Sequence, residues 1–405
     1  MEGTVEIKYG LISADSHAAF DRHDFTSRMS AAKWGDKIPQ VVPSPKEGED
    51  GWSVYGRRPS GEERGLANCP ALMGDPFPHW PRRWDDVPRT CYDPVERLKA
   101  LDIDGVDAEV LFPGSPGASY DRYGDPEFEL DAVRAYNDIL SDWVHVSDRY
   151  WPLAGLPWLQ PPEIIAREVE RAVEGGHRGI NVMAKTPRGL PALTDPHWDP
   201  IWDVCQSLGV PVHIHGSAGI GAGTSQRSWS GYSERQGHAA STSTSAVTPA
   251  QVIPHLIVSG LPARFPNLKF VFAEAGIGGL SYALSTCDHE WEAHRLWTEG
   301  ISERPSETIR RQFFANFWFE EEGIKLRHDI GIDNIMWESD FPHVPCYYPH
   351  SRNETARVVT GVPLEDRRRV LFENALRVYG MKATVSPSLP RDLYDPDPAP
   401  AAAPK

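Results

Sequence analysis

The sequence has few cysteines, and their arrangement excludes two classes of protein. There are five in 405 residues, an odd number, and none stands in a C-x-x-C pair. They are scattered along the chain as Cys69, Cys91, Cys205, Cys287 and Cys346. This spacing argues against a disulfide framework and against a thiolate zinc site, and it fits a reducing compartment.

Long apolar runs and clustered basic residues are also missing. No run approaches about 18 apolar residues, and residues 1–5 show no basic segment leading into an apolar stretch, so we expect neither a membrane span nor a signal peptide. The 41 basic and 57 acidic residues give a net charge of −16, which opposes binding to a phosphate backbone. We therefore expect no nucleic-acid partner and a cytoplasmic protein with an acidic surface.

What the chain does contain is an alternation of helices with short apolar strands. Asp93 followed by Pro94 is typical of a helix start, and Val95, Leu98 and Leu101 recur at helical spacing. The predicted strands are residues 9–14, 108–112, 152–156, 179–183, 210–215, 268–273 and 334–337. Strands alternating with helices indicate a parallel sheet, and no G-x-G-x-x-G follows the first strand to suggest a dinucleotide site. We predict an α/β fold in one domain over residues 1–385, and the number of strand–helix units favours a closed (β/α)8 barrel over an open doubly wound sheet.

Three segments fall outside this rhythm. Residues 39–89 are polar and rich in Gly and Pro, and we interpret them as an insertion after the first strand rather than core. Residues 217–247 are rich in Gly, Ser and Thr, with Trp229, Tyr232 and His238 interleaved. A lid over the substrate and a disordered surface insertion are equally good interpretations of this loop. Residues 386–405 form a Pro/Ala-rich tail that we expect to be disordered.

Three strand ends carry side chains that commonly bind metals. Asp15 and His17 share one face of the first strand, because side chains alternate along a strand. His213 and His215 face one way in another strand, and His215, nearer the strand end, is the better ligand. Asp340 closes the last predicted strand. Helix capping by the aspartates and a core role for one histidine are the ordinary alternatives. Together the residues offer two imidazoles and two carboxylates, which suit zinc or manganese.

Three residues are candidates for proton transfer. Glu274 follows an apolar run and could move a proton or orient a ligand, although a capping role is nearly as good an interpretation. Asp340 could hold or deprotonate a water, and His213 is the third candidate catalytic residue.

At these residues the chain resembles the amidohydrolase-related family, in the branch of the aminocarboxymuconate semialdehyde decarboxylase-like enzymes. The resemblance runs from about residue 11 to residue 381 and rests on the order and spacing of several segments. These are ADSH (14–17), YDPVERLKALDIDGVDAEVLFP (92–113), PVHIHG (211–216), HLIVSGLPARFPNLKFVFAEAGIG (255–278), MWESDFPH (336–343) and ENALRVYG (373–380). The resemblance implies a distorted TIM barrel with one divalent metal, held by Asp15, His17, His215 and Asp340. Glu274 falls where many members have a histidine that contacts substrate.

The chain departs from the family pattern just after His17. Many members have a histidine two residues later, and the subgroup with a D-S-H start usually has a glutamate three residues later. Here those positions are Ala19 and Phe20. We expect the Phe20 ring to lie near the site, making it drier and suited to a flat, apolar substrate. No lysine stands out as the carboxylated bridge of a two-metal hydrolase, which favours a single metal.

Three functions compete at this stage. The resemblance and the single metal favour non-oxidative decarboxylation of an aromatic or conjugated carboxylate, with Asp340 moving the proton. A metal-dependent hydrolase of an amide, ester or lactone is the alternative, because the same four ligands serve both reactions. Ala19 and Phe20 leave open a catalytically silent binding barrel. We expect a small-molecule substrate, a carboxylate, and a homodimer or homotetramer.

Overall fold

The computed structural model describes residues 3–59, 66–73, 80–114, 116–117, 120–184, 186–215, 231, 233–244 and 247–386. At its centre are eight parallel strands in the order β11-β10-β9-β8-β7-β6-β5-β2. Their bounds are β2 Ile12–Ala18, β5 Ala108–Pro113, β6 Tyr150–Ala154, β7 Gly179–Val182, β8 Val212–His215, β9 Phe270–Ala273, β10 Phe313–Phe317 and β11 Ile335–Trp337. Strands that are consecutive in this set are therefore neighbours in space, as in a (β/α)8 barrel.

The barrel closes where β2 meets the segment that follows β11. The backbone N–H of Asp340 donates to the carbonyl oxygen of Asp15 at 3.0 Å, and that of His17 donates to the carbonyl oxygen of Phe341 at 2.7 Å. A parallel bridge joins Ser16 to Phe341. The predicted barrel is confirmed in a nearly closed form, and its seam brings together three of the predicted metal ligands, Asp15, His17 and Asp340.

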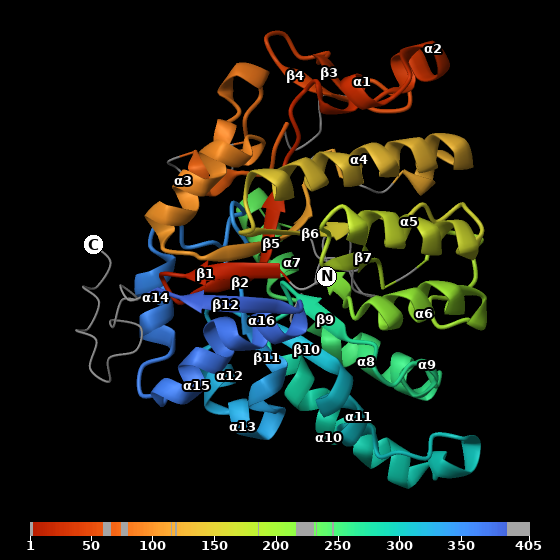
Figure 1. Cartoon of the computed structure of the whole chain (residues 1–405), viewed down its shortest axis with the longest axis vertical. Helices are drawn as coiled ribbons and strands as arrows, with labels where there is room; N and C mark the ends of the chain where they lie inside the picture. Colours follow the sequence, from red (N-terminus) through yellow and green to blue (C-terminus); the bar gives the residue numbers. More distant parts are fainter. Residues whose placement is uncertain are drawn as a thin grey trace.

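Helices surround the strands (Figure 1). The longer ones are α3 Pro94–Asp104, α4 Pro126–Val146, α5 Pro162–Glu174, α6 Asp199–Leu208, α7 Glu234–Thr242, α8 Thr248–Val258, α10 Gly278–Ala293, α11 Pro305–Gln312 and α14 Ser351–Val358. The shorter ones are α1 Asp24–Arg28, α2 Ala31–Trp34, α9 Leu261–Arg264, α12 Glu321–Lys325, α13 Arg327–Ile330, α15 Leu364–Arg368 and α16 Asn374–Val378. Asp93 caps α3 as predicted, since its side chain accepts from the N–H groups of Val95 and Glu96. None of the helices in the described residues is long and apolar enough to cross a membrane.

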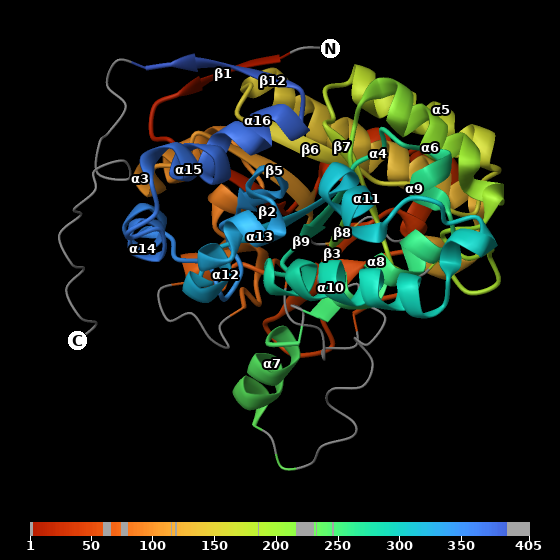
Figure 2. The same cartoon turned by 90° about the horizontal axis from the view of Figure 1, so that it is seen from below.

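The terminal strands lie apart from the barrel. β1 (Gly3–Ile7) pairs in parallel with β12 (Met381–Val385), and Figure 2 shows this pair and α7 at opposite ends of the molecule. Neither strand was predicted, and β10 was missed as well. β10 begins at Phe313, directly after α11 ends at Gln312, so no glycine or proline separates the two elements.

The insertion is more ordered than the sequence suggests. Within residues 39–89, β3 (Gln40–Pro43) and β4 (Asp50–Ser53) form an antiparallel hairpin. A second hydrophobic cluster consists of Ala19, Leu66, Ala67, Cys69, Trp84, Val87 and Cys91. The expectation of a segment without core was therefore wrong, because these apolar side chains bury one another against the end of β2.

Parts of the three unusual segments lie outside the described residues. These are 60–65 and 74–79 of the insertion, 387–405 of the tail, and much of 217–247, including Trp229, Tyr232 and the His238 side chain. Helix α7 occupies part of the last segment.

A buried ion pair supports the seam. Arg97 of α3 and Glu109 of β5 are both fully buried, and the Nε and Nη2 atoms of Arg97 each donate to a Glu109 oxygen at 2.8 Å. Arg97 also donates to the carbonyl oxygens of His17 at 3.1 Å and Phe341 at 3.4 Å. One guanidinium therefore contacts both sides of the barrel closure.

We expect Arg97→Met to lower the free energy of unfolding by about 3–5 kcal/mol, because it leaves Glu109 as a buried, uncompensated charge. Urea denaturation followed by circular dichroism measures this loss. The double variant Arg97→Met/Glu109→Leu removes both charges and should recover much of it. A loss below about 1 kcal/mol in the single variant would contradict a structural role for the pair.

Candidate metal centre

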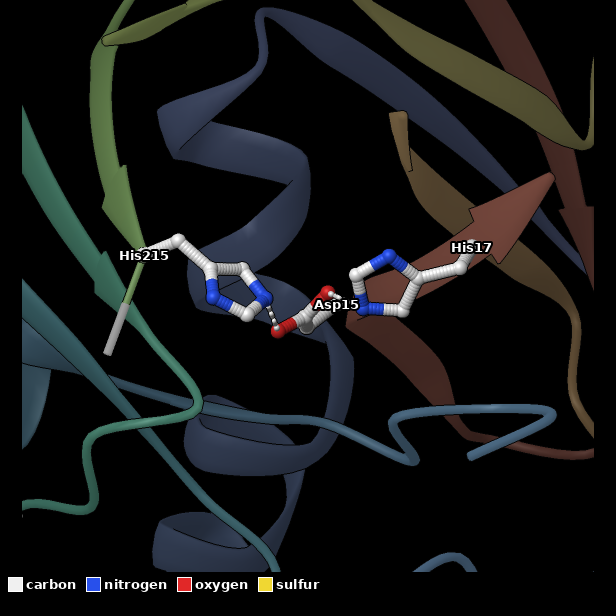
Figure 3. A group of neighbouring side chains, drawn as sticks. All are labelled: Asp15, His17 and His215. Atoms are coloured by element: carbon white, nitrogen blue, oxygen red, sulfur yellow. Dashed lines mark ion pairs between the residues drawn. The ribbon is translucent and has the colours of Figure 1, made fainter. Parts of the chain in front are cut away.

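Asp15, His17, His215 and Asp340 converge at one end of the barrel. The Nε2 atom of His17 lies 3.4 Å from Oδ1 of Asp15 and 3.1 Å from Oδ1 of Asp340. The Nε2 atom of His215 lies 3.5 Å from Oδ2 of Asp15. Figure 3 shows Asp15 between the two imidazole rings. The structure thus brings ligand atoms of Asp15, His17 and His215 within 4.8 Å of one another, and Asp340 joins this group through its contact with His17. The binding of a metal by these four residues stays a prediction.

His343 is a neighbour of this group that the sequence analysis did not single out. Its Nδ1 atom lies 2.9 Å from Oδ1 of Asp340, and its ring stacks on that of His17 with centroids 3.8 Å apart. His17, Asp340 and His343 can offer ligand atoms that all lie within 4.8 Å of one another. The available signal was its position three residues after Asp340, within a turn closed by a hydrogen bond from the His343 N–H to the Asp340 carbonyl.

The burial of Asp15 is the strongest indication of a cation site. Its side chain is fully buried, and neither carboxylate oxygen has a hydrogen-bond partner within the described residues. A buried carboxylate without partners is costly unless a cation or a proton compensates it. Imidazole nitrogens of His17 and His215 lie 3.4 and 3.5 Å from its two oxygens, and two imidazoles with a carboxylate form a common ligand set for a divalent metal.

The protonation equilibria of the site are strongly shifted. Burial lowers the pKa of His17 to about 4 and that of His215 to about 3, so both rings are neutral at pH 7, the form that binds metals. Burial, and next the charges of Glu338 and Asp340, raise the pKa of Asp15 well above its usual value. For Asp340, burial acts upward, but His343 and His17 outweigh it and hold its pKa below the usual value. The site therefore crowds buried acids together, and a bound cation would stabilise their ionised forms.

Glu274 and Glu338 form a second layer of acids behind the ligands. Oε2 of Glu274 lies 3.3 Å from Nδ1 of His215, and the backbone N–H of Glu274 donates to Oε2 of Glu338 at 3.1 Å. Burial, and next the charge of Asp340, raise the pKa of Glu274. This placement supports an orienting role for Glu274, because carboxylates commonly hold metal-binding histidines by their second ring nitrogen. Glu338, which is fully buried, was missed, although a charged residue directly after a buried strand was a usable signal.

Two of these residues sit in strained backbone conformations. Glu274 has φ 47° and Asp340 has φ 53°, in the left-handed region that side chains other than glycine rarely adopt. Glu274 directly follows β9, and Asp340 lies three residues after the end of β11. Strain of this kind is concentrated at functional sites, where the surrounding fold imposes it.

The structure does not bring His213 into the ligand group. Its Nδ1 atom lies 3.1 Å from the carbonyl oxygen of Ile180, and its Nε2 atom lies 2.9 Å from the hydroxyl of Tyr379. The His213 and Tyr379 rings are stacked with an angle of 9° between their planes. These contacts agree with the core alternative for one histidine of β8, and no contact supports the predicted catalytic role.

Phe20 does not face the site, so the expectation of a stacking surface there was wrong. Its ring is buried and packs edge-on against Phe25 and Tyr136, at centroid distances of 5.6 and 5.4 Å. Ala19, the preceding residue, instead lines a small pocket with His17 and His343. The chain leaves β2 at Ala18, and the next two side chains point to different surroundings.

Phe20→Ala is accordingly expected to lower the free energy of unfolding by about 3–5 kcal/mol, because it leaves a cavity among aromatic rings. Metal affinity should stay within twofold of wild type, since the ring touches no ligand. Phe20→Leu is the matched control and should lose less stability. Calorimetric metal titration together with thermal unfolding checks both expectations. A large change in metal affinity would show that Phe20 contributes to the metal site after all.

Comparison with known proteins gives three informative similarities. The family model described as Amidohydrolase matches residues 37–381. A 2-amino-3-carboxymuconate-6-semialdehyde decarboxylase from Dictyostelium discoideum is 26% identical over 265 residues, covering 64% of this chain and 68% of the relative. A gamma-resorcylate decarboxylase from Polaromonas sp. is 26% identical over 298 residues, covering 70% and 86%.

A solved structure shares the fold. It is a dihydroxybenzoic acid decarboxylase from Polaromonas sp. with bound manganese and the inhibitor 2-nitroresorcinol. The TM-score is 0.59 at 20% sequence identity, and the alignment covers 92% of this chain and 97% of the other. This similarity extends the likeness of fold over nearly the whole chain.

Proposed function

Because the chain belongs to the amidohydrolase family, we propose that it is a metal-dependent decarboxylase of aromatic carboxylates. Asp15 carries the proposal: a fully buried carboxylate without a hydrogen-bond donor, set between His17 and His215. Both relatives described above are named as decarboxylases, and the substrates in their names are carboxylates. Site and relatives thus support the same chemistry.

Four residues would hold one divalent ion, zinc or manganese: Asp15, His17, His215 and Asp340. When bound, the ion supplies positive charge that attracts the substrate carboxylate and an adjacent oxygen. His343 would hold Asp340 through the 2.9 Å contact, and Glu274 would hold His215 through the 3.3 Å contact. These two contacts fix the orientation of a ligand from each side of the barrel.

The remaining requirement is a proton for the ring carbon. Decarboxylation breaks the bond between the ring and the carboxyl carbon, and the electron pair of that bond stays on the ring. We assign the transfer to Asp340, whose carboxylate takes up a proton from solvent when the substrate binds and delivers it to that ring carbon while carbon dioxide leaves. Asp340 is left as the carboxylate from which it started, so each turnover consumes one proton.

The test is carbon dioxide release by the manganese- or zinc-loaded protein from a panel that includes 2,6-dihydroxybenzoate, with chelator-treated protein as control. We expect release that depends on the metal, and about one bound ion per chain by elemental analysis. A hydrolysed amide, ester or lactone without carbon dioxide release from any carboxylate would contradict the proposal and support the hydrolase alternative.

We also propose that the enzyme is cytoplasmic and forms a homodimer or homotetramer. All five cysteines are free, which supports the cytoplasmic location that the sequence predicts. Light scattering after size-exclusion chromatography tests the predicted homodimer or homotetramer.

A further inference from the structure

Glu338 is a fully buried carboxylate that forms no part of the predicted ligand set. It directly follows β11, and its Oε2 atom accepts a hydrogen bond from the backbone N–H of Glu274 at 3.1 Å. No donor reaches its Oε1 atom within the described residues. A carboxylate buried with so few donors costs free energy, so its retention calls for an explanation other than stability. The hydrogen bond from Glu274 provides that explanation.

This hydrogen bond acts on a strained turn. Glu274 has φ 47°, and Gly276, two residues later, has φ 60°. The far end of the turn is held in the same way, because Oε1 of Glu320 accepts from the N–H of Ile277 at 2.8 Å. A residue other than glycine stays in the left-handed region only where surrounding contacts outweigh the strain. Glu338 supplies such a contact at the start of the turn, and Glu320 supplies one at its end.

The backbone conformation of Glu274 decides where its side chain points. Its Oε2 atom lies 3.3 Å from Nδ1 of His215, and Nε2 of the same ring lies 3.5 Å from Oδ2 of Asp15 (Figure 3). A carboxylate at Nδ1 keeps the proton of a neutral imidazole on that nitrogen and leaves Nε2 free to bind a metal. A change of φ at Glu274 would redirect its Cα–Cβ bond and remove the carboxylate from Nδ1.

We propose that Glu338 is a positioning residue of the metal site, which holds Glu274 in its left-handed conformation and thereby aims the Glu274 carboxylate at Nδ1 of His215. This inference rests on the proposed function, since it concerns the same metal site. It gives Glu338 no contact with the ion or the substrate. The role needs a hydrogen-bond acceptor and not a charge, so an uncharged side chain of the same reach should fill it.

The experiment measures zinc binding to the chelator-treated full chain by competition with a chromophoric chelator. Glu338→Leu keeps a similar size but removes the acceptor, and it should weaken zinc binding about 10- to 100-fold, the usual effect of changes behind a metal ligand. Glu338→Ala should show the same loss, so that a poorly folding leucine variant does not decide the outcome. Glu338→Gln keeps an acceptor and should retain most of the affinity.

The matched control is another buried glutamate. Glu168 of α5 accepts from the side chains of Asn137 and Arg171. Glu168→Gln should leave zinc binding unchanged, because none of these contacts reaches the ligand group. Circular dichroism should show the same helix content in all variants as in wild type.

A double variant tests whether Glu338 acts through Glu274. Once the Glu274 carboxylate is gone, its aim no longer matters, so Glu338→Leu/Glu274→Ala should bind zinc no more weakly than Glu274→Ala alone. A merely structural role for Glu338 would instead give losses that add. Additive losses therefore overturn the inference. An unchanged affinity in Glu338→Leu and Glu338→Ala, or a loss in Glu338→Gln as large as theirs, overturns it as well.

The outcomes also separate this inference from the proposed decarboxylation. Zinc binding that depends on Glu338 as expected, without carbon dioxide release from any carboxylate, supports the positioning role and overturns the decarboxylation. Carbon dioxide release by wild type, together with zinc binding that is independent of Glu338, overturns the positioning role alone. A wild-type protein that binds neither zinc nor manganese overturns both.

Discussion

His215→Ala is expected to purify with less than about a tenth of the wild-type metal content and to show no measurable turnover. The reason is geometric: His215 supplies a neutral imidazole to Asp15 from the opposite side to His17. Removing one of four ligands leaves the metal ion with an incomplete coordination shell, so that it binds more weakly and compensates the buried charge of Asp15 less. Elemental analysis of the protein, purified without chelator and dialysed against metal, measures the effect.

The matched control is the other histidine of the same strand. His213→Gln should retain its metal, because His213 contacts Ile180 and Tyr379 rather than the ligand group. It should lose stability instead, since a buried hydrogen-bonded ring is replaced. Equal metal content in wild type and His215→Ala would show that the ion binds elsewhere or not at all. Metal loss in His213→Gln alone would exchange the roles of the two histidines.

Asp340→Asn is expected to lower turnover by about 10²–10⁴-fold, the usual contribution of a positioned acid–base group. Asparagine has nearly the same shape but cannot carry the proton. The protein should remain folded, because the backbone N–H of residue 340 still donates to the Asp15 carbonyl and closes the barrel. Turnover of metal-loaded protein, normalised to bound metal, separates the proton-transfer loss from weaker binding of the ion.

Asp329→Asn provides the comparison, as it makes the same chemical change at an exposed position. It should leave turnover within twofold of wild type. A near-wild-type rate in Asp340→Asn would reduce Asp340 to a ligand and a seam residue, and the proton would then have to come from another group bordering the pocket.

Much of the fold could be predicted from local patterns. The start of α3 at Asp93 and Pro94 depends on a capping interaction spanning only three residues. Apolar strands such as β8 and β9 were recognisable because their composition is set by burial on both faces. Where a local signal was absent, as between α11 and β10, the prediction failed. Helices and strands could thus be predicted from the sequence wherever interactions between neighbouring residues determine them.

The position of the candidate ligands could also be predicted, because it depends on where the strands end. Asp15, His17, His215 and Asp340 stand in or just after strands, and in a barrel strand ends of one kind meet at one face. The sequence by itself therefore determined the barrel and the placement of these four residues at one end of it, but it did not single out Glu338 and His343, which lie beside them.

Only the tertiary structure decided how these residues face one another. The seam pairs Ser13 with Ser339, 326 positions apart, through hydroxyls 2.9 Å apart. The stacking of His343 on His17 follows from this closure. Phe20 shows the opposite outcome, since packing against Phe25 and Tyr136 turns it away from the site. Contacts between residues so far apart depend on the free energy of the whole packed core, which no local pattern encodes.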